Sequence, residues 1–213
     1  DTHNYTILTG TLVPYVDDGM DYIPGVIGGN TGSFNFHDVS RLDYFYDAVK
    51  WAAENGIASG TGRYTFSPNA VCTRAQTVTF LWRAAGSPLP RYRVCPFTDV
   101  QPSDYYYNAV LWASNMGIVN GATATTFDPN GNVTREQIAA ILYRYEGSPT
   151  VSGSLSGYPD QAQVSSFAVT AMQWAVGTGI ITGVTSGGRT TLSAKGNATR
   201  AQVAVMLHRF LTF

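Results

Sequence analysis

One tetrapeptide recurs three times in this chain and constrains its fold more than any other feature. It reads Thr-Arg-Ala-Gln at 73–76 and 199–202, and Thr-Arg-Glu-Gln at 134–137. Thr73, Thr134 and Thr199 are 61 and 65 residues apart, and each opens an apolar stretch. A period longer than a single hairpin indicates repeated supersecondary units. The sequence therefore predicts three similar units, each with an arginine at a helix start.

Other landmarks keep the same register. An aromatic-x-Asp motif opens each unit, a Trp-Ala pair follows, and a glycine closes a turn nine residues after each tryptophan. A unit of about 60 residues buries too little surface to be stable alone, so the three are expected to pack on one another. The landmarks are Asp38, Asp99 and Asp160; Trp51, Trp112 and Trp174; and Gly60, Gly121 and Gly183.

Each unit is predicted to form a helix, a turn, a short extended piece and a second helix. Phe45, Ala48, Val49 and Ala52 follow the spacing of one apolar helix face. The second helix should begin at the repeated threonine, because Thr-x-x-Gln is a capping box that contributes on the order of 1 kcal/mol. Three like-faced second helices predict a mainly α fold with a central three-helix bundle and pseudo-threefold symmetry.

The repeats divide the chain into residues 34–88, 95–149 and 156–213. Residues 1–33 do not share the repeat, and we interpret them as a linker or the edge of an upstream module of the same polypeptide. The chain starts at Asp1 without a hydrophobic leader, which is typical of a mature or trimmed fragment. It has no run of 18 apolar residues, so no membrane insertion is expected.

Composition narrows the partners. The chain is 13% charged with a net charge of −1, which argues against nucleic acid. Its 13% aromatic content suits neutral or lightly charged polar ligands, and its low lysine with high glycine and threonine is typical of extracellular proteins. Cys72 and Cys95 allow two interpretations: a disulfide between the first two repeats, contributing about 3 kcal/mol, or two buried free thiols.

The repeated arginines need an explanation. Arg74, Arg135 and Arg200 take the first helical position, where the helix dipole disfavours a cation by about 0.3–1 kcal/mol. Helix N-terminal amides together with a guanidinium could bind a carboxylate or phosphate ligand. Alternatively, each arginine pairs with a carboxylate to latch adjacent repeats together. The candidate carboxylates are Asp38, Asp99 and Asp160.

The remaining landmarks also have two interpretations. The tryptophans could stack on a sugar ring or pack in the core, and the glycines could let backbone approach a ligand or simply permit a tight turn. The histidines sit at unrelated repeat positions, so no metal site and no cofactor is expected. No catalytic motif stands out either, which predicts a protein that is not an enzyme. The histidines are His3, His37 and His208.

The combination of aromatic-x-Asp, Trp-Ala, Gly-Ile-x-x-Gly, Phe-x-Pro and Thr-Arg-Ala-Gln closely resembles the S-layer homology domain over about residues 34–213. The resemblance implies a three-pronged, pseudo-threefold module that anchors a bacterial surface protein to the cell wall. It implies a ligand too: a peptidoglycan-linked secondary cell wall polysaccharide, often ending in a pyruvylated amino sugar, held in grooves between repeats. The family's arginine contacts the anionic end, at Arg74, Arg135 and Arg200 here.

Two departures from the family pattern matter. Where the family motif usually has a glutamate, this chain has glutamine, at Gln76, Gln137 and Gln202. Glutamine keeps the capping box but removes a negative charge near each arginine. The third unit has Tyr158 for phenylalanine and a longer turn, so the groove that uses this turn is expected to be degenerate, and a groove with Arg74 or Arg135 to be active. The alternatives are a protein–protein assembly module and an enzyme whose active site the sequence does not show.

Overall fold

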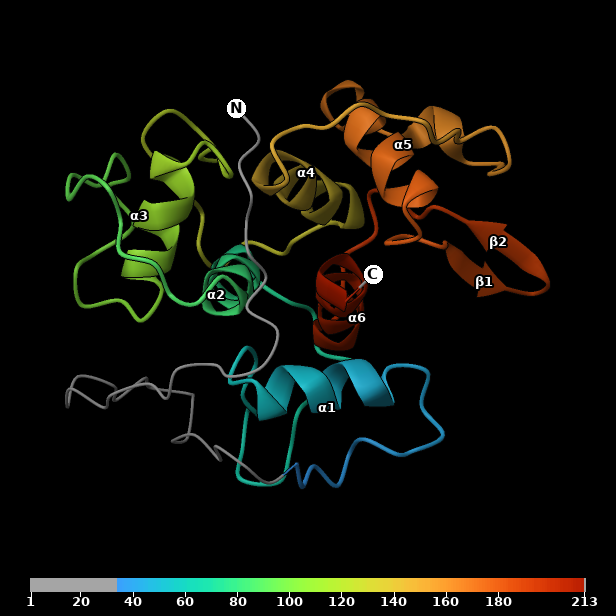
Figure 1. Cartoon of the computed structure of the whole chain (residues 1–213), viewed down its shortest axis with the longest axis horizontal. Coiled ribbons are helices and arrows are strands. Elements are labelled where there is room, and N and C mark those ends of the chain that lie inside the picture. The colour runs from blue at the N-terminus through green and yellow to red at the C-terminus, as the bar shows by residue number, and fades with distance from the viewer. Residues whose placement is uncertain (1–33, 213) are drawn as a thin grey trace.

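The computed structural model describes residues 34–212, which form six α-helices, two short 3-10 helices and one hairpin (Figure 1). The predicted linker at residues 1–33 lies outside the described residues. The mainly helical class predicted from the sequence is confirmed. The elements are α1 (Tyr46–Glu54), α2 (Arg74–Ala84), α3 (Tyr107–Asn115), α4 (Arg135–Tyr145), η1 (Gln161–Gln163), η2 (Ser166–Ala168), α5 (Val169–Gly177), β1 (Val184–Ser186), β2 (Arg189–Thr191) and α6 (Arg200–Thr212).

The second helix of each repeat lies inside the molecule and the first helix lies outside. Figure 1 shows α2, α4 and α6 in the middle, with α1, α3 and α5 around them. Each inner helix packs on the outer helix of the next repeat: α2 on α3, α4 on α5 and α6 on α1. The last pair joins the third repeat to the first, so the contacts close a cycle. This cyclic order supports pseudo-threefold symmetry, which stays a prediction.

One buried apolar cluster draws residues from all three repeats, as the small size of a single unit requires. The stripe predicted for α1 faces this cluster, and Val49 and Ala52 are fully buried. The extended piece of each repeat also contributes one side chain that is 0% exposed. These side chains are Phe66, Phe127 and Leu192, which occupy the same register in the three repeats.

The capping boxes predicted at the inner helices are present. The Thr73 hydroxyl accepts a hydrogen bond from the Gln76 backbone N–H at 3.2 Å, and the Gln76 side-chain oxygen accepts from the Thr73 N–H at 3.1 Å. This exchange fixes where each inner helix begins. The same two bonds join Thr134 to Gln137 and Thr199 to Gln202.

The aspartate of each aromatic-x-Asp motif fixes a turn within its own repeat. Both carboxylate oxygens of Asp99 accept backbone N–H bonds, from Phe127 at 2.7 Å and from Asp128 at 2.8 Å. Asp128 has a left-handed backbone, with φ of 59°, and the carboxylate holds this uncommon conformation in place. Asp38 binds Phe66 and Ser67 in the same way, and Asp160 binds Leu192 and Ser193.

The glycine that closes each turn is required by the chain itself. A Cβ added to Gly121 would lie 2.3 Å from the Thr123 carbonyl oxygen and 2.6 Å from the Phe97 ring. The aromatic of the aromatic-x-Asp motif thus packs directly on the glycine of its own unit, which explains the glycine without a ligand. A Cβ added to Gly60 would likewise lie 2.7 Å from the Phe36 ring, and one added to Gly183 would lie 3.0 Å from the Tyr158 ring.

The two cysteines are free thiols, so the disulfide interpretation is wrong. Their sulfur atoms have separate partners: Cys72 accepts from the Thr77 hydroxyl at 3.5 Å, and Cys95 donates to the Phe97 carbonyl at 3.6 Å. Burial raises the pKa of the Cys72 thiol to about 11. Cys72 therefore stays protonated at neutral pH and behaves as a small core residue.

We expect Asp99→Asn to lower the free energy of unfolding by about 1–2 kcal/mol at pH 7, because the amide can accept only one of the two backbone bonds. Burial raises the pKa of Asp99, but the Phe127 and Asp128 amides outweigh it and leave the pKa below its ordinary value. The ionised carboxylate therefore stabilises the fold above the ordinary aspartate pKa of about 3.9, and this stability is lost as the pH falls through the lowered pKa. Urea unfolding curves of the wild type and the variant should converge in acid; a pH-independent difference would contradict this role.

Candidate ligand site between the repeats

The starts of the inner helices bind the backbone of the next repeat. At the start of α2, the Arg74 N–H donates to the Gly131 carbonyl at 2.9 Å and the Ala75 N–H to the Pro129 carbonyl at 3.0 Å. The third N–H is bound by the capping threonine, so the first three amides of the helix are occupied and are not free to bind an anion. The same bonds join α4 to Gly196 and Ala194, and α6 to Ala70 and Pro68.

Just before these helices, a closed ring of backbone hydrogen bonds joins the three repeats. Cys72 donates to Ala198 at 2.9 Å, Ala198 donates to Val133 at 2.9 Å, and Val133 donates to Cys72 at 3.0 Å. All three residues are 0% exposed. Since each repeat both donates and accepts, removal of any repeat would leave a buried N–H and a buried carbonyl unpaired.

The arginine side chains bridge the repeats in the same cyclic order. Each Nε donates to a backbone carbonyl of the next repeat at 2.9 Å, whereas the ion pair found within residues 34–212 joins Lys50 to Glu54. The alternative in which each arginine pairs with an aspartate is therefore wrong, because no arginine–aspartate ion pair occurs within residues 34–212. The Nε bonds run from Arg74 to Phe127, from Arg135 to Leu192 and from Arg200 to Phe66.

Two of the three arginines have a second carbonyl partner and an aromatic neighbour. The Arg200 Nη2 atom donates to the Ser59 carbonyl at 2.7 Å, and its guanidinium lies 4.7 Å from the Phe66 ring centroid. The hydrogen bond occupies an N–H group of the guanidinium and the ring covers one of its faces, so neither is open to a ligand. Arg74 repeats them, with Asn120 at 3.0 Å and the Phe127 ring at 4.7 Å.

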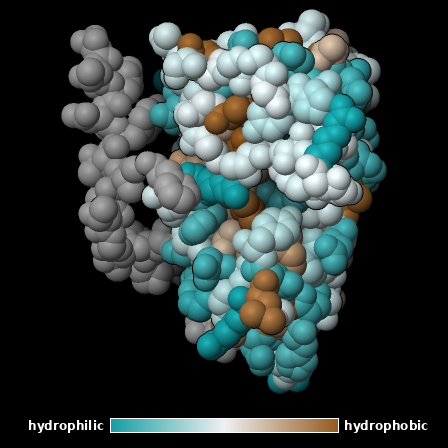
Figure 2. Space-filling model, turned by 90° about the vertical axis from the view of Figure 1, so that its right-hand side faces the viewer, coloured by the Kyte–Doolittle hydropathy of each residue, from teal (hydrophilic) through white to brown (hydrophobic). Residues whose placement is uncertain are grey.

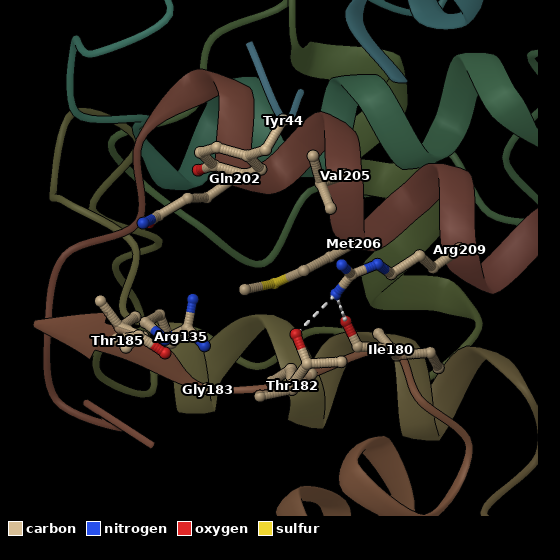
Figure 3. A pocket seen from close by; sticks show the side chains of 12 residues that line it. Tyr44, Arg135, Ile180, Thr182, Gly183, Thr185, Gln202, Val205, Met206 and Arg209 are labelled. Carbon is tan, nitrogen blue, oxygen red and sulfur yellow. Dashed lines mark hydrogen bonds between the residues drawn. The ribbon is translucent and has the colours of Figure 1, made fainter. Parts of the chain in front are cut away.

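Arg135 differs from both. It is 5% exposed, and its hydrogen bond to Leu192 uses Nε alone. Throughout residues 34–212, no fully buried side-chain nitrogen or oxygen lacks a partner, so the terminal nitrogens of Arg135 border open space. Figure 3 shows them directed toward a cavity. Burial lowers the pKa of Arg135, although a guanidinium stays charged at neutral pH.

This cavity has a volume of about 300 Å³ and is formed by all three repeats (Figure 3). Its lining contains two guanidiniums, those of Arg135 and Arg209, and no carboxylate. The turn of the third repeat, with Thr182 and Gly183, forms one wall, and Tyr44 of the first repeat stands at the rim. The turn expected to make a degenerate groove is thus the one beside Arg135.

Arg209 is a second repeated arginine, which the sequence analysis missed. Its Nη1 atom donates to the Ile180 carbonyl at 3.3 Å and to the Thr182 hydroxyl at 3.2 Å, which holds it against the turn (Figure 3). The signal was present, since an arginine follows each motif threonine by ten residues. Arg144 makes the equivalent bond to Ile118 at 3.5 Å, and the third member is Arg83.

The interface between the second and third repeats has an extra contact. Glu136, 4% exposed, replaces the alanine of the other two motif copies. Its carboxylate accepts from the Ser165 N–H at 2.9 Å and from the Ser165 hydroxyl at 2.7 Å. This interface is therefore held by a carboxylate where the other two use a second arginine bond and a ring.

The tryptophans lie in the helix contacts and do not line this cavity. Trp112 and Trp174 are 5% and 6% exposed, which leaves almost no ring surface for a sugar. Trp51 is half-buried and lies 5.1 Å from the His208 ring of α6. His208 thus packs on the outer helix of the next repeat, as Tyr143 packs on Trp174 at 5.6 Å.

The cavity offers guanidinium donors, the Gln202 amide and threonine hydroxyls, a set that suits an anionic, polyhydroxylated ligand. Figure 2 shows one face of the molecule, which is mainly hydrophilic or neutral, with small separate hydrophobic patches and a hollow near its middle. In the described part of the chain, no group of three or more His, Cys, Asp or Glu side chains is placed to hold a metal ion. None of the described helices is long and apolar enough to cross a membrane.

Comparison with known families assigns the fold. The S-layer homology domain matches residues 35–78, 96–139 and 157–204, one segment in each predicted repeat and together more than half of the chain. The three segments contain the aspartate, tryptophan and arginine landmarks described above. The chain belongs to the S-layer homology domain family.

Similar proteins carry this segment within much longer chains. An endoglucanase of Bacillus sp. (strain KSM-635) is 32% identical over 185 residues, covering 85% of this chain and 19% of the endoglucanase. The surface-layer 125 kDa protein of Lysinibacillus sphaericus is 31% identical over 177 residues, which cover 81% of this chain and 14% of that protein. The S-layer protein sap of Bacillus anthracis is 25% identical over 155 residues, which cover 72% of this chain and 18% of that protein. This chain thus spans less than a fifth of each relative.

We expect the arginines to differ in their effect on stability. Arg200→Ala leaves two carbonyl partners unpaired and should lower the free energy of unfolding by about 3 kcal/mol, whereas Arg135→Ala leaves one and should lower it by about 1–2 kcal/mol. Urea unfolding at neutral pH, monitored by tryptophan fluorescence, measures both. Equal losses would contradict the difference in partners.

Proposed function

We propose that this chain is a non-catalytic module that anchors a bacterial surface protein to the cell wall. An endoglucanase and two S-layer proteins share the matched segment, so what they have in common is the segment and not an activity. We further propose that the module binds a peptidoglycan-linked secondary cell wall polysaccharide. The observation that carries this ligand class is the cavity with two guanidiniums and no carboxylate.

The cavity suits the acidic end of such a polymer, a pyruvylated amino sugar. A volume of about 300 Å³ is at the lower end of the usual range for ligand pockets, which fits one sugar residue. The free terminal nitrogens of Arg135 can donate two parallel bonds to the ketal carboxylate. Gln202 and Thr182 supply neutral partners for sugar hydroxyls, and the 70% exposed Tyr44 offers a ring face at the rim.

The proposal places the working protein outside the cell, on the wall surface. The remainder of the polypeptide, joined through residues 1–33, would carry the activity that is displayed there. A separate anchoring module and functional region agree with the small share of each relative that the matched segment covers.

The direct test is retention on isolated cell walls. Sacculi of the host organism should sediment the chain, and sacculi stripped of their polymers by acid should not. Salt should weaken retention, because screening acts over about 8 Å at physiological ionic strength. Failure to sediment with untreated host walls would refute anchoring. Self-association that rises with concentration, without any retention on walls, would favour the assembly module instead.

We expect Gln202→Glu to weaken retention roughly tenfold, because it puts a carboxylate into the cavity that holds Arg135. A glutamate keeps the oxygen that accepts from Thr199, and an acidic residue in the first helical turn does not destabilise the fold. Gln76→Glu is the matched control, since Gln76 takes the same position in α2 and does not line this cavity. Binding assays and thermal melts of both variants distinguish a ligand effect from unfolding; equal weakening by both would refute the assignment to this cavity.

A further inference from the structure

The three junctions between repeats differ in one respect that bears on binding: how many N–H groups of the motif arginine the protein already binds. We propose that the anionic sugar is recognised in the groove between the second and third repeats alone, where Leu192 leaves Arg135 free to bind it. Arg74 and Arg200 then act as structural latches. This inference rests on the proposed function and assigns it to one of three grooves that the repeat pattern treats as equal.

The first step concerns the donors of each guanidinium. A guanidinium has five N–H groups in a fixed plane. In Arg74 and Arg200, Nε and Nη2 both donate to backbone carbonyls of the next repeat. In Arg135 the bond to Leu192 engages Nε alone, so four N–H groups remain for a ligand. A carboxylate needs two parallel donors, and Arg135 can offer them without breaking a protein bond.

The second step concerns the faces of the guanidiniums. The rings of Phe127 and Phe66 lie 4.7 Å from the Arg74 and Arg200 guanidiniums and attract them through cation–π interactions. At the same register the third repeat has Leu192, which has no ring. Leu192 therefore leaves the arginine of the second repeat without the ring contact that the other two arginines have.

The third step concerns charge. Aspartates attract the guanidinium of each motif arginine, Asp160 that of Arg135 included, so this attraction does not separate the three junctions. The groove of Arg135 contains a second cation, Arg209, in its lining and no carboxylate. An anion entering this groove meets two positive groups, with no carboxylate among the lining side chains to oppose it.

The fourth step concerns the stability of this interface. An arginine that serves a ligand can contribute less to holding two repeats together. The pair of bonds from Ser165 to the buried carboxylate of Glu136 occurs at this interface, and the other motif copies have alanine in place of Glu136. Glu136 thus substitutes for the second bond that Arg135 does not make.

The test is calorimetric titration of the chain with the methyl glycoside of a pyruvylated N-acetylhexosamine, with the same glycoside lacking the ketal as the neutral control. We expect one binding site per chain for the pyruvylated sugar and a loss of at least tenfold in affinity for the neutral one. Two or three equivalent sites would overturn the proposal.

Leu192→Phe tests the determinant itself, since it restores the side chain that the other two repeats have at this register. We expect at least a tenfold loss of affinity with the helical circular dichroism unchanged; unaltered affinity in the folded variant would refute the role of Leu192. Because the larger ring enters a fully buried position, a second pair of variants is needed in case this one does not fold.

Arg135→Lys and Arg200→Lys form that pair, because lysine keeps the charge but cannot make the planar double contact. We expect Arg135→Lys to lower affinity at least tenfold with a small change in melting temperature, and Arg200→Lys to lower the melting temperature with affinity within twofold. The reverse pattern would overturn the proposal. A wild-type chain that sediments with host walls but does not bind the pyruvylated glycoside would also overturn it, while leaving wall anchoring intact.

Discussion

The structure depends on a closed ring of three backbone hydrogen bonds, in which Cys72, Val133 and Ala198 each donate to one repeat and accept from another. No side chain is required for this ring, so it tolerates the different residues found there. It does require all three repeats, since each supplies one donor and one acceptor in a fully buried place. The helix starts that follow the ring depend on the neighbouring repeat in the same way, because their amides donate to its carbonyls. The triplet is therefore the smallest unit in which these backbone groups are satisfied.

This arrangement explains why a cation occupies the start of each inner helix. The neighbouring carbonyls take up the helix amides and also accept the arginine Nε, so the local field that the guanidinium meets is set by acceptor oxygens as well as by the helix dipole. Arg74 and Arg200 each donate two bonds to backbone carbonyls, whereas Arg135 donates one and keeps its terminal nitrogens at a cavity. Under the ligand-binding role proposed above, the structural and the binding use of the guanidinium would fall to different repeats.

Local features were predictable from the sequence, and long-range partners were not. The capping box at Thr73 depends on residues three apart, so its pattern can be read directly. The acceptor of Arg74 is the carbonyl of Phe127, and a backbone carbonyl leaves no trace in residue identity, which is why the evenly spaced aspartates suggested an ion pair instead. The partners of Asp99 were missed for the same reason, because they are backbone N–H groups, which residue identity does not reveal. The bond from Arg135 to the Leu192 carbonyl is another long-range contact of this kind, since it joins residues 57 apart.

The pairing of α6 with α1 has a mechanical consequence. Tension that enters the first repeat at Phe34 reaches the second repeat through the covalent chain. It also reaches the third repeat through the α1–α6 contact and through the bonds from Arg200 to Phe66 and Ser59. Two parallel routes share the force, and both lead to the repeats that form the cavity of Arg135. If the chain anchors a displayed protein, as proposed above, a load that enters at Phe34 is spread over the closed triplet.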